Sequence, residues 1–140
     1  MGNSGTVSFE MELVLATIAT SILVIIFYLN VRQLIDRTYD VKRLNDTVAI
    51  AEAISISTIE KGHVPAEIST TEKEIKTIDG SCKNSCNNLG CINLLSSILP
   101  HLEINNLSSL EGYSVQLGKS GMITVRSCLS KSGKIIEVTR

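Results

Sequence analysis

The stretch LVLATIATSILVIIFYLNV, from Leu13 to Val31, decides the fold of this chain of 140 residues. It contains no charged side chain, and most of its residues are aliphatic. A helix needs roughly 20 such residues to cross the hydrocarbon core of a bilayer. A helix buried in a soluble core normally keeps a polar face, and here only Thr17, Thr20 and Ser21 offer one. We therefore interpret the stretch as a membrane span or a helix enclosed in a filament, with a buried core helix as the alternative.

The helical pattern continues beyond Val31 without glycine or proline as far as Gly62. Apolar residues return there every three, four or seven positions, which is typical of a helix with one apolar face. We predict one continuous helix from near Val7 to near Glu60, ended by Gly62 and followed by Pro65. Its second half is expected to bury a stripe formed by Leu34, Val41, Leu44, Val48, Ala51 and Ile54.

The C-terminal part changes period. A polar, turn-rich segment holds one short predicted strand at Glu74–Ile78, and a short helix is expected to end by Leu99 because Pro100 cannot continue it. The segments YSVQL, MITVRSC and KIIEVTR are rich in β-branched residues and are separated by glycine-containing turns, which predicts three antiparallel strands. The expected fold class is α+β. It consists of a long N-terminal helix, with a membrane or filament-core half and an amphipathic half, packed on a small C-terminal antiparallel sheet.

Four cysteines lie in this small polar part: Cys82, Cys86, Cys91 and Cys128. In an oxidising compartment they predict two disulfides, with three possible pairings. We expect at least one bridge to tie the loop 82–91 to the predicted strand that contains Cys128. A metal site with four thiolates is an alternative, although its usual signature is a pair of C-x2-C motifs. Partly free thiols are the other alternative.

Two N-glycosylation sequons, at Asn45 and Asn106, agree with an outward-facing C-terminal part. The positive-inside rule favours the opposite, because several basic residues follow the apolar run: Arg32, Arg37, Lys42 and Arg43. These charges alternate with acids along the helix, so we give them less weight.

The composition also excludes several functions. A net charge of −1 leaves no basic surface for a nucleic-acid partner. His63 and His101 are isolated beside prolines, and no nucleophile, carboxylate pair or phosphate loop accompanies them. We predict neither an enzyme nor a cofactor or metal.

The residues before the apolar run, Thr6-Val7-Ser8-Phe9-Glu10-Met11, follow Gly5. This segment resembles the class III signal peptide of archaeal type IV pilin-like proteins, whose pattern is Q-x-S-x-E-F. Ser8 and Glu10 match the pattern, whereas Thr6 and Met11 differ from it. Together with the long helix and the C-terminal sheet, the resemblance covers the whole chain.

The resemblance implies a structural subunit, major or minor, of a surface filament. A prepilin peptidase would cleave between Gly5 and Thr6, and the mature chain would wait among membrane lipids with its N-terminus in the cytoplasm. An ATP-driven assembly machine would then draw it into a helical filament of like subunits outside the cell. Glu10 would pair with the N-terminal amine of a neighbouring subunit and set the register. The expected parts are a leader (1–5), a transmembrane or filament-core helix half (6–31), an amphipathic half (32–62) and a disulfide-stapled extracellular head (63–140).

Two other functions fit the same residues. One is an unprocessed, membrane-anchored binding or accessory module of a surface machine. The other is an enzyme subunit tethered by the helix, for which the sequence offers no candidate residues.

Overall fold

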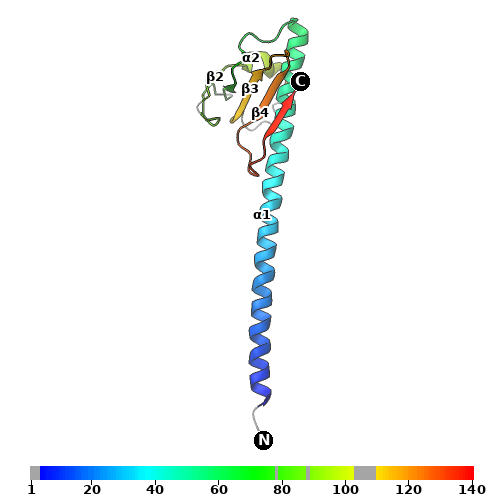
Figure 1. Ribbon diagram of the computed structural model, residues 1–140, viewed down its shortest axis with the longest axis vertical. Coiled ribbons are helices and arrows are strands. Elements are labelled where there is room, and N and C mark those ends of the chain that lie inside the picture. The colour runs from blue at the N-terminus through cyan, green and yellow to red at the C-terminus, as the bar shows by residue number, and fades with distance from the viewer. Residues whose placement is uncertain (1–3, 78, 88, 103–109) are drawn as a thin grey trace. The chain divides into compact units, whose positions relative to one another are not determined.

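The computed structural model describes residues 4–77, 79–87, 89–102 and 110–140, with side chains from Met11 onward. It confirms the α+β class: a long N-terminal helix is followed by a five-stranded sheet (Figure 1). The chain divides into two compact units, the first ending at Arg37 and the second covering Thr38–Arg140. Helix α1 supplies the described residues of the first unit and one element of the second.

Helix α1 runs over Ser4–Lys61, close to the predicted bounds. No glycine or proline lies between Thr6 and Lys61, and this absence of helix-breaking residues allows a helix of this length. Gly62 follows with φ 71°, a left-handed conformation that glycine adopts without a Cβ penalty. The predicted stop at Gly62 is therefore confirmed.

The sheet has the strand order β2-β1-β3-β4-β5. As predicted, the last three strands form antiparallel hairpins. The sheet as a whole is mixed rather than antiparallel throughout, because β2, a strand that the sequence did not predict, pairs with β1 in parallel. A strand of two residues carries no periodic signal by which the sequence could have shown it. The strands are β1 (Lys73–Ile75), β2 (Cys91–Ile92), β3 (Tyr113–Leu117), β4 (Ile123–Ser127) and β5 (Ile136–Thr139).

A short helix connects β2 to the later strands. Helix α2 spans Leu95–Ile98, and a 3-10 turn, η1, continues over Leu99–His101. Pro100 lies in this 3-10 turn, so the α-helix ends before the proline as expected.

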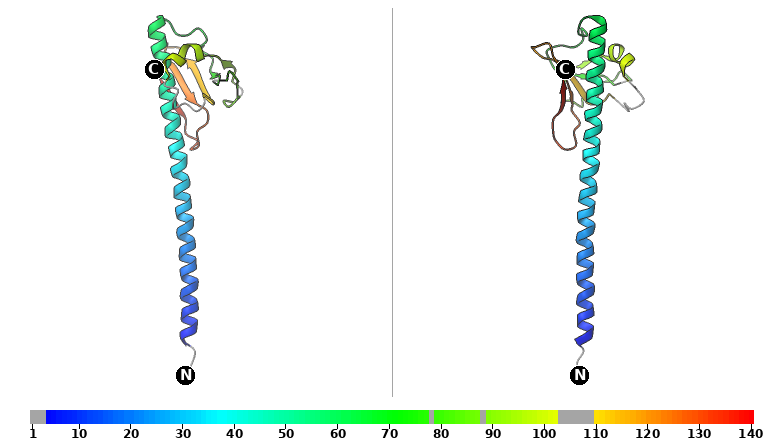
Figure 2. Two further views of the ribbon diagram at one scale, coloured as in Figure 1. Left: turned by 180° about the vertical axis from the view of Figure 1, so that it is seen from behind. Right: turned by 90° about the vertical axis from the view of Figure 1, so that its right-hand side faces the viewer.

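In the second unit the sheet lies along one side of the C-terminal half of α1 (Figure 2). Ile50 and Ile54 of the helix are fully buried against the inner face of the sheet, where Tyr113, Val115 and Val125 point inward. Burial of these side chains is the main favourable term for folding of this unit.

The buried face of α1 differs from the predicted stripe. Ala51 and Ile54 are buried as expected, but Val41 and Leu44 are 57% and 43% exposed. Arg43 and Thr47 face the sheet instead. They have the same helical spacing, and they are tolerated inside because each finds hydrogen-bond partners there. The prediction weighed apolarity alone and therefore placed the first half of the stripe on the wrong face.

Candidate functional site

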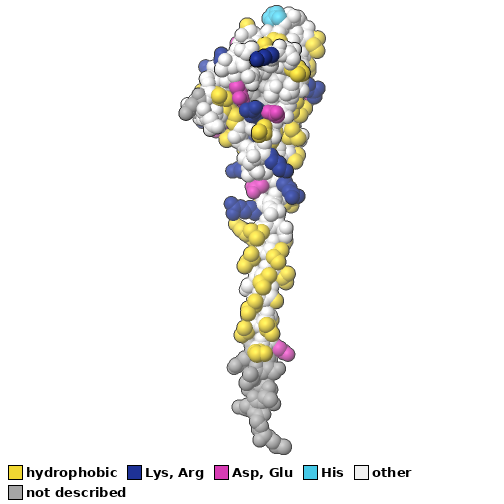
Figure 3. Space-filling view, in the orientation of Figure 1, with side chains coloured by type: hydrophobic (Ala, Val, Ile, Leu, Met, Phe, Trp, Pro, Cys, Tyr) yellow, Lys and Arg dark blue, Asp and Glu magenta, His cyan; other side chains and the backbone are white. Residues whose placement is uncertain are grey.

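The most unusual surface of the first unit is the apolar part of α1. From Met11 to Val31 its large hydrophobic side chains are exposed, from 37% at Val31 to 71% at Phe27. In Figure 3 they form a hydrophobic surface that is nearly free of charge. Soluble monomers rarely expose an apolar patch of this size, and such patches mark membrane or protein contacts. Helix α1 is long and apolar enough to cross a membrane by length and composition, and this stretch of it has no burial.

The threonine, serine and asparagine side chains of this surface donate hydrogen bonds to carbonyls of their own helix. Thr17 Oγ1 donates to the Val14 carbonyl at 2.8 Å, and Thr20 Oγ1 donates to the Ala16 carbonyl at 2.9 Å. Ser21 and Asn30 make equivalent bonds, at 2.7 and 2.9 Å, to carbonyls one turn earlier. A hydrocarbon environment supplies no water, so polar groups there need partners within the protein. For these donor groups, the helix itself supplies the partner.

Charged residues bound the apolar surface. Glu12 stands at one end and Arg32 at the other, with no charge between them. At ~1.5 Å per residue the interval from Leu13 to Val31 is about 28 Å long. That length matches the hydrocarbon core of a bilayer, which is about 30 Å thick.

The predicted processing and assembly residues lie at the start of α1. Gly5, Thr6 and Glu10 belong to this helix, but their side chains fall outside the part that the structure describes. The cleavage site and the register-setting carboxylate therefore stay predictions.

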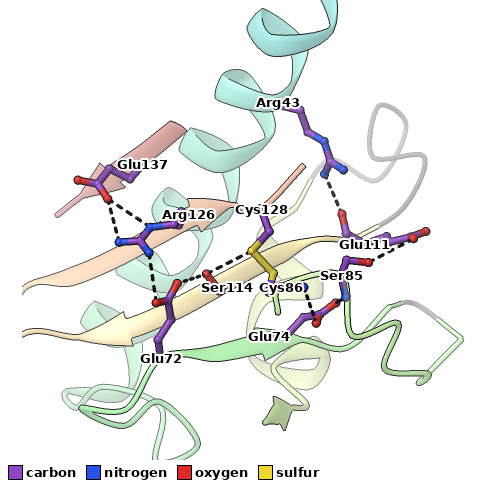
Figure 4. The surroundings of a disulfide bond; sticks show 10 residues. All are labelled: Arg43, Glu72, Glu74, Ser85, Cys86, Glu111, Ser114, Arg126, Cys128 and Glu137. Carbon is purple, nitrogen blue, oxygen red and sulfur yellow. Dashed lines mark hydrogen bonds and ion pairs between the residues drawn. A yellow bond between two sulfur atoms is a disulfide. The ribbon is translucent and has the colours of Figure 1, made fainter. Parts of the chain in front are cut away.

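The four cysteines form two disulfides, as predicted. Cys82 pairs with Cys91, and Cys86 pairs with Cys128 (Figure 4). The second bridge ties the loop 82–91 to the residue that directly follows β4, as we expected. Its Cα atoms are 5.2 Å apart, within the usual range for a disulfide. The cysteine loop is thereby held over the outer face of the sheet.

A buried carboxylate lies beneath this loop. Glu74 of β1 is 1% exposed and points to the outer face of the sheet (Figure 4). Its two oxygens accept hydrogen bonds from the backbone N–H groups of Ser85 and Cys86, at 3.1 and 3.2 Å. A buried carboxylate is tolerated when donors of this kind satisfy it. Glu74 could not be recognised from the sequence, because an acid in a short polar strand gives no sign of burial.

Glu74 also lies near two sulfur atoms. One of its carboxylate oxygens and the sulfurs of Cys82 and Cys91 lie within 4.8 Å of one another. A metal would require thiolates, and here the two sulfurs are bonded to each other. While the disulfide is formed, the two sulfurs are not thiolate ligands, and Glu74 binds the backbone of the loop 82–91.

A second buried charge joins α1 to the sheet. The Arg43 guanidinium lies between two aromatic rings, with its carbon 5.5 Å from the centre of the Tyr39 ring and 4.5 Å from that of Tyr113. It donates to the Glu111 carbonyl at 2.8 Å, while the Tyr113 hydroxyl donates to Asp46 at 2.9 Å. Burial raises the pKa of Tyr113, so this phenol stays a neutral donor.

Gly112 is required beside this arginine. Its φ is 73°, and a Cβ there would lie 2.6 Å from the Leu129 side chain and 3.5 Å from an Arg43 nitrogen. A larger residue would have to move the Leu129 side chain and would be strained at this positive φ. The sequence showed this glycine only as the residue before a strand.

Asp40 holds the loop between β4 and β5. Its carboxylate accepts hydrogen bonds from the backbone N–H groups of Lys131 and Ser132, at 2.8 and 3.0 Å, and from the Ser130 hydroxyl at 3.3 Å. Hydrogen bonds from Ser132 and Lys131 keep the pKa of Asp40 below its usual range. An acid of α1 therefore positions the loop between β4 and β5.

The remaining candidates are dispersed. Asn45 is exposed on α1, while Thr47 of the same sequon is buried and donates to the Arg43 carbonyl at 2.7 Å. Asn106 lies outside the described residues. His101 Nε2 is 3.1 Å from a Glu60 oxygen and joins η1 to the end of α1.

Comparison with known proteins identified no relative of this chain. No protein-family model, curated protein or solved structure matches this chain. The fold consists of a long N-terminal helix with an apolar first half and a small sheet that packs on its second half. Two disulfides cross-link the part that contains the sheet. This arrangement resembles a pilin fold.

Proposed function

We propose that the chain is a structural subunit, major or minor, of a type IV pilus-like surface filament. The observation that carries the proposal is the exposed apolar surface from Met11 to Val31, whose threonine, serine and asparagine side chains donate to carbonyls of their own helix. Such a surface can contact membrane lipid before assembly and the same helix of neighbouring subunits in the filament. The same surface thus serves storage in the membrane and packing in a filament.

The N-terminal residues provide the cleavage site and a charge that can pair between subunits. Cleavage after Gly5 by a prepilin peptidase makes Thr6 the new N-terminus and Glu10 the fifth residue of the mature chain. A carboxylate in hydrocarbon costs roughly 2.5–3.5 kcal/mol on insertion scales. Pairing with the amine of a neighbouring subunit lowers that cost and penalises wrong registers, since a misplaced subunit leaves both charges unpaired. Head-to-tail contacts form helical filaments when they do not close into a ring.

The disulfides support an outward-facing second unit. Disulfides persist in oxidising compartments and are rare in the cytosol. Two of them in so small a unit compensate for its limited core. An ordered, stapled domain that remains outside while the helix is enclosed is consistent with a filament subunit.

The first test is the mass of the protein isolated from its own cells. We expect loss of residues 1–5, shown by intact mass and N-terminal sequencing. Glu10→Gln is expected to leave membrane insertion intact but to reduce filament yield, with Glu12→Gln as the matched control. Normal filament yield in Glu10→Gln would refute the pairing role.

One alternative shares the same anchor. If the isolated protein keeps residues 1–5 and extracts into detergent as a monomer, it is an unprocessed, membrane-anchored accessory or binding module of a surface machine. The exposed helix surface fits that function as well, so processing decides between the two.

A further inference from the structure

Two arginines lie directly after the apolar surface of α1. Arg32 and Arg37 are both exposed, and within the described residues neither forms an ion pair or a hydrogen bond. Asp36 lies one turn after Arg32 on a neighbouring part of the helix surface, yet it makes no ion pair with Arg32 either. Two exposed cations without a partner among the described residues are available to an anionic group outside the first unit.

The geometry of the two arginines restricts that partner. They are five positions apart, so their side chains project about 140° apart around the helix and about 7.5 Å apart along it. A single anionic side chain on a neighbour cannot reach both. A layer of lipid headgroups surrounds the helix on all sides and extends several ångströms beyond the hydrocarbon. Arginine also binds phosphate oxygens in a bidentate manner.

The other end of the apolar surface has the opposite charge. Glu12 is exposed there, and the sequence has no lysine or arginine before Arg32. The two boundaries of the span therefore differ in the headgroups that they favour. Anionic lipids are attracted at the arginine end and not at the glutamate end.

We propose that Arg32 and Arg37 bind the phosphate groups of anionic membrane lipids and fix the depth of the helix in the bilayer before assembly. This rests on the membrane-anchored state in the proposed function and adds the residues and the headgroup class. Each basic residue near an anionic surface contributes roughly fivefold in binding. The preference is electrostatic and weakens in high salt.

The test uses a tryptophan reporter, since the chain has no tryptophan of its own. Tyr28→Trp places one on the lipid-facing surface, one turn before Arg32. The full chain is reconstituted into vesicles of phosphatidylcholine and phosphatidylglycerol, with either lipid brominated as a quencher. We expect phosphatidylglycerol to be favoured next to the reporter by about fivefold or more. In Arg32→Gln/Arg37→Gln the preference is expected to fall to near unity.

Two controls keep the result specific. Lys42→Gln removes an exposed cation farther along α1 and is expected to change the preference by less than about twofold. Leu13→Trp reports from the glutamate end, where we expect no preference for phosphatidylglycerol. No preference at Tyr28→Trp, or a preference that survives the double substitution, overturns the inference. Failure of the chain to enter vesicles would instead overturn the membrane anchor of the proposed function.

Discussion

The guanidinium of Arg43 stacks on the ring of Tyr113 at 4.5 Å and so joins α1 to β3 in the second unit. Burial of a charge is costly unless aromatic faces or hydrogen-bond acceptors compensate for it. Arg43 has both, because Glu111 supplies a carbonyl and Tyr39 a second ring. The helix face that meets the sheet is therefore determined partly by this cation.

Arg43→Ala is expected to destabilise the second unit by about 2–4 kcal/mol, because a desolvated cation–π contact and a charged hydrogen bond are lost together. Arg43→Met should cost less, since its side chain refills the space between the rings. The measurement is urea unfolding of the full chain in detergent, followed by tyrosine near-UV circular dichroism. Lys42→Ala, an exposed neighbour, is the matched control and should stay within about 0.5 kcal/mol of wild type. Equal losses of stability at Arg43 and Lys42 would contradict a stabilising role of the contact between Arg43 and Tyr113.

The two disulfides are expected to differ in their contribution. Cys86–Cys128 spans 42 positions and Cys82–Cys91 spans 9. In the chain-entropy model the longer loop contributes about 4 kcal/mol and the shorter about 2.7 kcal/mol. Replacing each pair by serines and comparing unfolding midpoints tests this order. Peptide mapping without reduction should recover both pairings from the wild-type chain, and a scrambled pattern would refute them.

The sequence predicted most of the fold because its signals are local. The apolar run, the absence of helix breakers before Gly62 and the β-branched segments near the C-terminus each specify an element by periodicity. The bounds of α1 and β3 agree closely with those predictions. The cysteines likewise gave the number of bridges and the link from the loop to Cys128.

The tertiary partners could not be predicted in the same way. Arg43, Thr47 and Glu74 are polar, and only the folded chain shows that acceptors or donors meet each of them where it is buried. Residues of this kind are normally expected at the surface. For the same reason the stripe with Val41 and Leu44 was assigned to the buried face, although the sheet packs on the other side of the helix.

Glu74→Gln is expected to lower the stability of the second unit by about 1–3 kcal/mol, because one amide oxygen replaces two charged acceptors for buried N–H groups. The cysteine loop should then exchange its amide hydrogens faster at Ser85 and Cys86, which hydrogen-exchange mass spectrometry measures. Glu137→Gln is the matched control, since that carboxylate forms only a partly exposed ion pair with Arg126. Unchanged exchange in Glu74→Gln would show that the disulfides alone hold the loop.

The carboxylate of Asp79 makes stability depend on pH in the acid range. Hydrogen bonds from the Thr77 hydroxyl, and from the backbone N–H and hydroxyl of Ser81, lower the pKa of Asp79 from 3.8 to about 2. A carboxyl with a depressed pKa in the folded state stabilises that state above its unfolded pKa. The contribution is therefore complete near neutral pH, declines as the pH falls below 3.8, and is gone below about 2.

Asp79→Asn should accordingly lower the melting temperature at pH 7, and the gap to wild type should close between about pH 4 and pH 2. Thermal unfolding of both chains across this range measures the gap directly. The contributions of the other carboxyl groups cancel in the difference because both chains contain them. Ser81→Ala removes one donor but keeps the acid, so it should show a smaller gap at pH 7 that closes over the same range. A gap that stays constant from pH 7 to pH 2 would mean that Asp79 acts by shape and not by charge.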